Sequence, residues 1–300
     1  MTNETGSRSG RALPRSLFVL SLLIALLALI AAAGGLFWPH VGEPFPFTTL
    51  RGDEIEITGR GLYAYDWAFR APILRGTDAV MLFVATPLLV AALWAARRGG
   101  LRSRLLLTGL LGVFLYNAAS VAFGVAFNPF FPVYLAYFSA SLFAFVLAFS
   151  TVAQADLAAA TSPRLPRRGI ASFVVLASLS TGVWLAELLP ALAQGEAPAS
   201  IASYTTDVTA LLDLGILLPA GILGGVLLWR GRPLGVLLSC VLLTLLTLTG
   251  LSVAGQTVMM MLEGNAPSAG ETALYVVPFL LLSLVAVGLL TVLLRHVDTQ

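Results

Sequence analysis

The sequence predicts an all-α, polytopic transmembrane bundle of about eight helices. Hydrophobic residues make up 58% of the 300-residue chain and charged residues 11%, with a mean hydropathy of +0.92. A soluble domain carries roughly 25% charged residues, so the charge available here cannot cover a water-exposed surface. The apolar residues also fall in continuous runs of roughly 20, the length that crosses the hydrocarbon of a bilayer. We therefore expect the chain in the cell membrane, with the lipid bilayer as its first partner.

Eight apolar runs are long enough to span the membrane. Breakers such as Asn128-Pro129 and Arg232-Pro233 separate them. The runs are continuous rather than alternating, which excludes the strands of a barrel. The predicted bundle covers 16–294, between a cytoplasmic N-terminal tail, 1–15, and a cytoplasmic C-terminal tail, 295–300. The predicted spans are 16–37, 77–96, 105–127, 130–152, 170–192, 208–229, 233–261 and 272–294.

Two of these spans have features of their own. The first follows several arginines and contains Ala31-Ala32-Ala33-Gly34, which also fits a cleavable signal peptide, although its length favours an uncleaved anchor. The seventh has about 29 residues, or ~44 Å at 1.5 Å per residue, so we expect it to tilt, to kink near Gly250 or to project beyond the membrane. Prolines at 87, 190, 219 and 278 predict further kinks.

The arginines predict the orientation. The chain holds 17 arginines, no lysine and 15 acidic residues. Four arginines, at 51, 60, 70 and 75, fall on one side of the predicted membrane, and the rest fall on the other side. The positive-inside rule makes the arginine-rich side, and with it both termini, cytoplasmic. The arginines on that side are Arg8, Arg11, Arg15, Arg97, Arg98, Arg102, Arg104, Arg164, Arg167, Arg168, Arg230, Arg232 and Arg295.

The longest connection, residues 39–76, is a small structured loop on the extracytoplasmic side. Residues 54–58 and 62–65 flank a turn at Gly59-Arg60-Gly61, which predicts a small β-hairpin. Residues 66–70 then predict an interfacial helical turn that leads into the second span. A structured loop of this length is typical of a lid or binding element, and a passive cap over the helix ends fits equally well.

Six polar residues within the spans form the candidate ligand-binding site. Polar side chains are costly in hydrocarbon and mark candidate functional positions. Nearly all of them fall in the extracytoplasmic halves of the spans, whereas the cytoplasmic halves are mostly Leu, Val, Ala and Phe. The sequence thus predicts a polar crevice that opens outward beneath the loop, above a dry cytoplasmic plug. The six are Asp78, Asn117, Tyr137, Glu187, Asp213 and Gln256.

Several of these side chains also have a purely structural explanation. Asp78 begins the predicted second helix, where the helix dipole favours a carboxylate, and it can pair with Arg75 three residues earlier. Glu187 lies near a helix end, where it can reach headgroup water. Asn117 can hydrogen-bond a neighbouring helix, which is worth about 1 kcal/mol. Asp213 lies about one and a half turns inside its span and is the hardest to explain in this way.

Metal and redox chemistry have little support in the sequence. Cys240 is the only cysteine, which excludes disulfides within the chain, thiolate metal clusters and iron–sulfur sites. His40 and His296 fall on opposite sides of the predicted membrane, which argues against a multi-histidine centre. The arginines lie in separate loops rather than on one face, so we expect no nucleic-acid partner. The sequence predicts no metal and no cofactor, and it sets no oligomeric state.

Three short motifs carry a resemblance to other membrane proteins. They are Gly61-Leu62-Tyr63, Arg75-Gly76-Thr77-Asp78, and the stretch from Tyr116-Asn117-Ala118-Ala119-Ser120 through Phe127-Asn128-Pro129. Over roughly residues 55–150 the chain resembles a group of uncharacterised bacterial multi-pass membrane proteins. That group has no assigned activity, so the resemblance implies a shared fold and no particular chemistry.

The predicted crevice favours a transporter or permease-like protein that takes a cation, a proton or a small polar solute. A shallow outer site above a dry plug also fits a membrane sensor or a subunit of a membrane complex. Paired carboxylates would suit an integral-membrane enzyme acting on a lipid or lipid-linked substrate at the outer leaflet. The sequence leans away from catalysis, because it has no Gly-x-Ser-x-Gly elbow and no phosphate-cradling loop.

Overall fold

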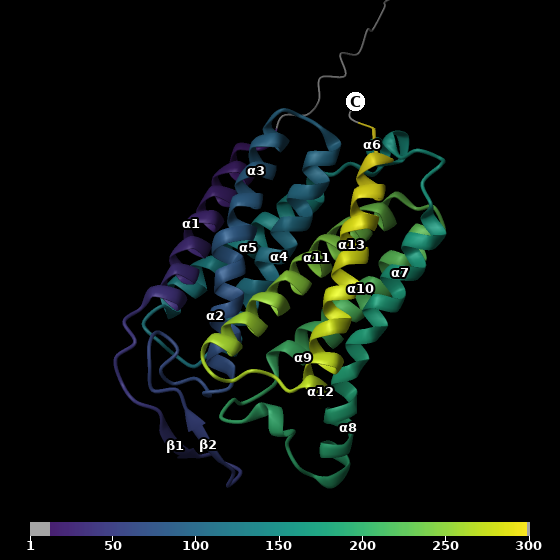
Figure 1. Ribbon diagram of the computed structural model, residues 1–300. Helices are drawn as coiled ribbons and strands as arrows, with labels where there is room; N and C mark the ends of the chain where they lie inside the picture. The colour runs from purple at the N-terminus through teal and green to yellow at the C-terminus, as the bar shows by residue number, and fades with distance from the viewer. Residues whose placement is uncertain (1–12, 299–300) are drawn as a thin grey trace, which may run out of the picture.

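Long apolar helices dominate the computed structural model, which describes residues 13–298 (Figure 1). Eight helices in this part of the chain are long and apolar enough to cross a membrane, which fits the predicted all-α bundle of a multi-pass membrane protein. Arg8 and Arg11 of the predicted N-terminal tail lie outside the described residues. The eight are Arg15–Phe37, Arg70–Arg97, Leu101–Gly124, Phe131–Thr151, Arg167–Gln194, Val208–Trp229, Pro233–Leu262 and Ala269–Arg295.

A short helix, α6 (Gln154–Ala160), connects the fourth span to the fifth. Four of the eight spans are unbroken α-helices. Each of the four is apolar along most of its length, so hydropathy alone located them within a few residues. The four are α1 (Arg15–Phe37), α4 (Leu101–Gly124), α5 (Phe131–Thr151) and α11 (Pro233–Leu262).

The other four spans are interrupted by an irregular turn. Three contain a π turn and one contains a 3₁₀ turn. In order they are α2 (Arg70–Val80), a π turn (Met81–Ala85) and α3 (Thr86–Arg97); α7 (Arg167–Leu179), a 3₁₀ turn (Ser180–Trp184) and α8 (Leu185–Gln194); α9 (Val208–Leu212), a π turn (Asp213–Leu217) and α10 (Leu218–Trp229); and α12 (Ala269–Glu271), a π turn (Thr272–Val276) and α13 (Val277–Arg295).

Proline explains the π turns. Each π turn ends two residues before a proline, namely Pro87, Pro219 or Pro278. Proline has no N–H, and its ring clashes with the carbonyl four residues earlier. In each span that carbonyl lies inside the π turn, whose wider ring makes room for the proline. Pro190 lies within α8, after the 3₁₀ turn of its span.

The seventh span, α11, is one continuous helix through Gly250. Figure 1 shows it running obliquely across the bundle, so its extra length is taken up by inclination rather than by a break at this glycine. Gly250 serves close packing instead. A Cβ added there would lie 2.1 Å from the Cβ of Ser283 on α13, and Ser283 donates a 2.8 Å hydrogen bond to the carbonyl of Thr247.

Residues 38–69, hereafter the hairpin loop, contain the two strands, β1 (Phe45–Thr48) and β2 (Glu54–Ile57). The strands are antiparallel, with Phe45 opposite Ile57. The predicted pairing of 54–58 with 62–65 is therefore wrong, because β2 pairs with the segment before it. Leu62 and Tyr63 are consecutive and both buried, whereas consecutive side chains of a strand point to opposite faces.

The second span begins at Arg70 rather than at residue 77, which shortens the predicted loop. The carbonyl of Trp67 accepts hydrogen bonds from the backbone N–H groups of Arg70 and Ala71, so the predicted turn at 66–70 leads directly into α2. The first turns of α2 contain two arginines but are packed inside the molecule, with Arg75 5% exposed. Hydropathy therefore placed this helix start too late.

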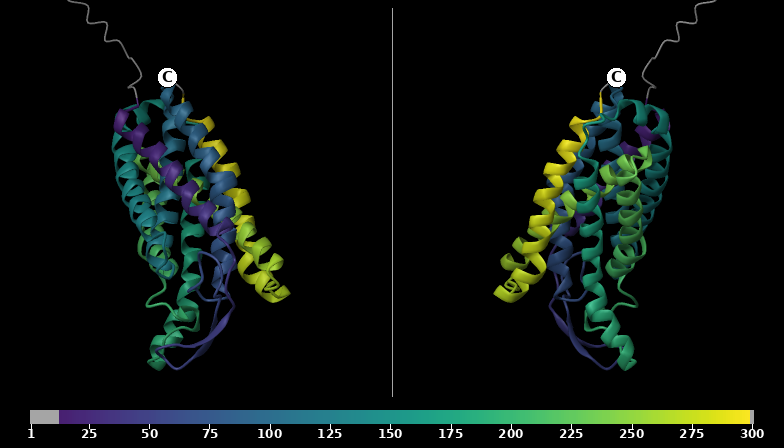
Figure 2. Two further views of the ribbon diagram at one scale, coloured as in Figure 1. Left: turned by 90° about the vertical axis from the view of Figure 1, so that its left-hand side faces the viewer. Right: turned by 90° about the vertical axis from the view of Figure 1, so that its right-hand side faces the viewer.

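The hairpin and the C-terminus lie at opposite ends of the bundle (Figures 1 and 2). Because the spans alternate in direction, the arginine-bearing connections gather at the end that holds the C-terminus. Arg102, at the start of α4, donates hydrogen bonds to the carbonyls of Val297 and Arg295. The two larger clusters of buried residues lie at α1, α3, α4 and α5, and at α7, α10, α11 and α13, and α11 contributes to both.

Candidate functional site

Three aspartates at the hairpin end of the bundle each accept a hydrogen bond from a tyrosine hydroxyl. Tyr63 donates to Asp78 at 2.6 Å, Tyr204 donates to Asp66 at 2.7 Å, and Tyr116 donates to Asp213 at 2.8 Å. In each pair the two residues come from different segments of the chain. The three pairs therefore join a loop to a span, one loop to another and one span to another, and they form two groups.

Asp78 belongs to the first group, beneath the hairpin loop. It is 5% exposed and lies near the C-terminal end of α2. The prediction that it begins a helix is therefore wrong, and the helix dipole does not account for it. Its neighbour on α1 is Gly35, where an added Cβ would lie 1.8 Å from the Asp78 carboxylate and 2.9 Å from the Tyr63 hydroxyl. Only a glycine leaves room for this carboxylate.

The predicted pairing of Arg75 with Asp78 is also wrong. The guanidinium of Arg75 binds both carboxylate oxygens of Glu263, at the C-terminal cap of α11. Elsewhere along the same two helices, the amide of Gln256 donates a 2.8 Å hydrogen bond to the hydroxyl of Thr77. Gly76 permits this approach, since a Cβ there would lie 2.3 Å from the Cα of Gln256. Gln256 thus joins α11 to the helix that carries Asp78.

Asp66 completes the first group, in the hairpin loop. It is 0% exposed, and its Oδ1 accepts hydrogen bonds from the Tyr204 hydroxyl and from the backbone N–H of Ala126. Burial raises the pKa of Asp66 above its usual value, and these two hydrogen bonds offset only part of that rise. The guanidinium carbon of Arg70 lies 4.5 Å from the centre of the Tyr204 ring.

The tyrosines of this group remain neutral donors. Burial, and then the nearby Asp78 and Tyr134, raise the pKa of Tyr63 well above its usual value. Burial and the neighbouring Asp66 likewise raise the pKa of Tyr204. These buried contacts fasten the hairpin loop, and the loop that contains Tyr204, to the ends of the spans.

Asp213 forms the second group, where two interrupted spans meet. It is the first residue of the π turn Asp213–Leu217 and is partly buried. Its Oδ1 accepts from Tyr116 of α4 at 2.8 Å, and its Oδ2 accepts from the indole N–H of Trp184 at 2.9 Å. Trp184 is the last residue of the 3₁₀ turn in the preceding span. Both donors are neutral, so neither balances the charge of an ionised carboxylate.

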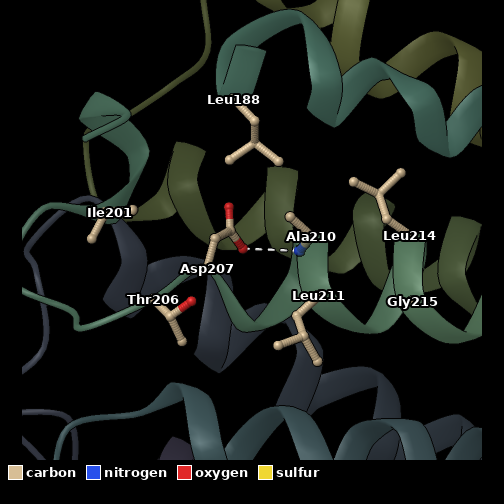
Figure 3. Close-up of a pocket in the computed structure, with 8 residues that line it drawn as sticks. All are labelled: Leu188, Ile201, Thr206, Asp207, Ala210, Leu211, Leu214 and Gly215. Atoms are coloured by element: carbon tan, nitrogen blue, oxygen red, sulfur yellow. Dashed lines mark hydrogen bonds between the residues drawn. The ribbon is translucent and has the colours of Figure 1, made fainter. Parts of the chain in front are cut away.

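A pocket of about 450 Å³ lies beside Asp213. Figure 3 shows Leu188 of α8 reaching toward Asp207 and Ala210. Asp207 caps α9 by accepting a 2.9 Å hydrogen bond from the backbone N–H of Ala210. The walls are mostly apolar, with Thr206 and Asp207 as the polar end. The lining residues are Leu188, Ile201, Thr206, Asp207, Ala210, Leu211, Leu214 and Gly215.

The structure distributes the six predicted site residues over several contacts. Asn117 and Tyr137 meet, with the Tyr137 hydroxyl donating at 3.1 Å to the Asn117 side-chain oxygen. Glu187 is exposed and accepts a 3.0 Å hydrogen bond from the backbone N–H of Ser200. Asp78 and Gln256 lie on neighbouring parts of α2 and α11, and Asp213 lies beside the pocket. None of the six lines that pocket, and whether they bind a solute stays a prediction.

Sequence reasoning missed the partners of the carboxylates. Tyr63, Asp66 and Tyr204 lie in loops, and Tyr116 directly precedes the predicted Asn117. The signal that could have found them is the presence of phenol and indole donors in a chain whose intramembrane carboxylates need partners. Within residues 13–298 no group of three or more His, Cys, Asp or Glu side chains is placed to hold a metal ion.

Comparison with known proteins adds no identification: no family model, no curated protein and no solved structure matches the chain.

Proposed function

We propose that the protein is a permease-like transporter in which Asp213 binds a proton or a small monovalent cation. The observation that carries the proposal is the position of Asp213 at the junction of two interrupted spans. Its π turn and the 3₁₀ turn that supplies Trp184 touch across the helix interface. Ion sites of secondary transporters are typically built from discontinuous helices, and π turns are common at functional positions.

The surroundings of Asp213 support a site that changes its protonation or its ligand. A carboxylate in a membrane span that is balanced by neutral donors gains stability when it takes up a proton or a cation. Tyr116 and Trp184 hold its two oxygens in place, while the pocket beside it gives room for a small solute. Three other irregular turns, at Met81–Ala85, Ser180–Trp184 and Thr272–Val276, supply further points at which the spans can bend.

We also propose the orientation that the arginines predict, with the arginine-rich end and both termini in the cytoplasm and the hairpin loop outside. Asp213 would then lie near the outer face, five residues after the start of α9, or about 7.5 Å along the helix at 1.5 Å per residue. A solute arriving from outside would meet the pocket before it met the carboxylate.

Proteoliposomes containing the purified protein test this proposal. A pH gradient and a membrane potential are imposed, and proton flux is followed with an entrapped pH dye, while uptake of radiolabelled sodium, rubidium and methylammonium is measured in parallel. We expect wild-type protein to carry protons or at least one of these cations. Asp213→Asn should lower that flux by about tenfold or more, the equivalent of roughly 1.4 kcal/mol in binding or activation.

The matched control is Asp53→Asn, the same chemical change on an exposed aspartate after the β1 strand. It should transport as the wild type does. Wild-type vesicles that move neither protons nor any of the three cations, or Asp213→Asn vesicles that transport at the wild-type rate, would contradict the proposal. The first result would favour a sensor or a subunit of a membrane complex.

A further inference from the structure

We propose that a second pocket, at the arginine-rich end of the bundle, binds the phosphate headgroup of an anionic phospholipid. The pocket has a volume of about 420 Å³ and lies between the start of α7 and the end of α10. It is separate from Asp213, which lies toward the other end of the same helices. Its lining residues are Leu165, Pro166, Arg167, Arg168, Gly169 and Trp229.

Glycines on α10 bring the two walls of this pocket together. A Cβ added at Gly221 would lie 1.6 Å from the hydroxyl of Ser178 on α7, and one added at Gly225 would lie 3.0 Å from the carbonyl of Ala171. After α10, Gly231 has a φ of +70°, and a Cβ there would lie 2.7 Å from a terminal nitrogen of Arg167. The close crossing therefore sets Arg167 beside the end of α10 and fixes the shape of the pocket.

The two arginines that line the pocket favour the binding of an anion. The Nε of Arg167 is buried and has no hydrogen-bond partner among the described residues. The guanidinium carbon of Arg168 lies 5.9 Å from the centre of the Trp229 ring, and the lining contains no carboxylate. A buried donor without a partner is costly. A phosphate would accept from both guanidiniums, and arginine binds phosphate oxygens through two parallel hydrogen bonds.

The flanks of the pocket favour a lipid over a soluble anion. Trp229 is 53% exposed at the end of a membrane span, and tryptophan is enriched at headgroup depth. On the outer surfaces of the same helices, Leu176 and Leu223 are 65% and 52% exposed. A phospholipid can thus place its phosphate on the two arginines and its acyl chains along this apolar flank.

Native mass spectrometry of the purified protein tests the proposal. The protein is titrated with phosphatidylglycerol or with phosphatidylcholine, and lipid-bound species are counted. We expect wild-type protein to retain one phosphatidylglycerol and to prefer it over phosphatidylcholine. The double variant Arg167→Gln/Arg168→Gln should bind that lipid about tenfold or more weakly, since each lost charge-assisted hydrogen bond is worth a factor of this order.

The matched control is Arg97→Gln/Arg98→Gln, which removes the same charge from the same end of the bundle at α3, far from α7 in Figure 1. It should keep wild-type affinity. Arg167→Lys should bind with intermediate affinity, because lysine keeps the charge but loses the planar fork. Thermal melting of each variant in the same detergent separates loss of binding from loss of folding.

Three results would overturn the proposal. They are equal binding of the two lipids by wild-type protein, equal loss of affinity in the control variant, and a folded double variant that still binds as the wild type does. Inorganic phosphate added at millimolar concentration should fail to displace the lipid. Its displacement of the lipid would assign the pocket to a soluble phosphate instead.

Discussion

The hydroxyl of Tyr63 donates a 2.6 Å hydrogen bond to the carboxylate of Asp78, and both side chains are almost completely buried. Tyr63 belongs to the hairpin loop and Asp78 to α2, so the bond ties the loop to the second span. The neighbouring Asp66–Tyr204 bond ties the same loop to the connection before α9. The hairpin loop is thus anchored by buried polar contacts rather than by apolar packing alone.

Tyr63→Phe should destabilise the protein through Asp78. The variant keeps the ring but leaves the buried carboxylate without its hydroxyl donor, at a cost of about 1–3 kcal/mol. Thermal unfolding in detergent should show a lower midpoint than the wild type. Tyr65→Phe removes a hydroxyl from an exposed tyrosine of the same loop and should unfold as the wild type does. Equal midpoints for Tyr63→Phe and Tyr65→Phe would contradict a structural role for the bond.

Gly35→Ala should be destabilising although alanine normally favours a helix. The added Cβ would lie 1.8 Å from the Asp78 carboxylate, and relieving such overpacking typically costs about 1–3 kcal/mol. Gly288→Ala is the matched control, because a Cβ at that position in α13 meets nothing within 4 Å. Measured by thermal unfolding, Gly288→Ala should equal or exceed the wild-type midpoint. A stable Gly35→Ala would show that Asp78 can move aside.

The Arg75–Glu263 pair should couple more strongly than the exposed pair Arg60–Glu43. The side chains of the first pair are 7% and 28% exposed, against 44% and 84% for the second. Double-mutant cycles on unfolding, with glutamine at each position, should give about 1–3 kcal/mol for the first pair and about 0–1 kcal/mol for the second. Equal coupling energies would mean that α2 and α11 are not held together by this contact.

Stability should fall as pH rises above the ordinary pKa of an aspartate because of Asp66. Burial raises its pKa in the folded protein above the ordinary aspartate value of 3.8, so folded protein binds the proton more tightly than unfolded protein does. The stabilisation is complete below pH 3.8 and is lost as pH rises through the raised pKa. The thermal midpoint of the wild type minus that of Asp66→Asn should therefore decrease with pH over this window.

Tyr204→Phe extends this test. It removes a hydrogen bond that lowers the pKa of Asp66, so the window in which stability falls should move to higher pH. A midpoint difference that instead increases with pH would show that Asp66 is more acidic in the folded protein than in the unfolded chain.

Hydropathy was sufficient for the spans but not for their ends. Each span is one continuous apolar stretch of the sequence, so all eight spans could be predicted from hydropathy. The start of α2 was not, because its arginines resemble a loop until their partners are known. Arg75 pairs with Glu263, and Arg70 stacks on Tyr204, and both partners lie far away in the sequence.

The prediction of the hairpin was wrong, and the prediction of the site incomplete, for the same reason: both depend on contacts between distant parts of the sequence. Residues 62–65 look like a strand locally, but Leu62 and Tyr63 are both covered by the bundle. The true first strand contains Pro46, which only an edge strand tolerates. For the site, the sequence marked Asp78 and Asp213 as costly, because residue type and depth are local properties. It could not name Tyr63, Tyr116 or Trp184 as their donors, because those contacts depend on how the spans pack.

The π turns change how the faces of three spans must be counted. In an α-helix each residue advances the side chains by about 100° around the axis, so one additional residue would turn every later side chain toward a different neighbour. A π turn accommodates one such residue within a single wider turn. The residues of α9 and those of α10 therefore keep different phases along the sequence. A shortening of Asp213–Leu217 by one residue would leave the side chains of α10 facing their present neighbours, while it removed the turn that holds Asp213.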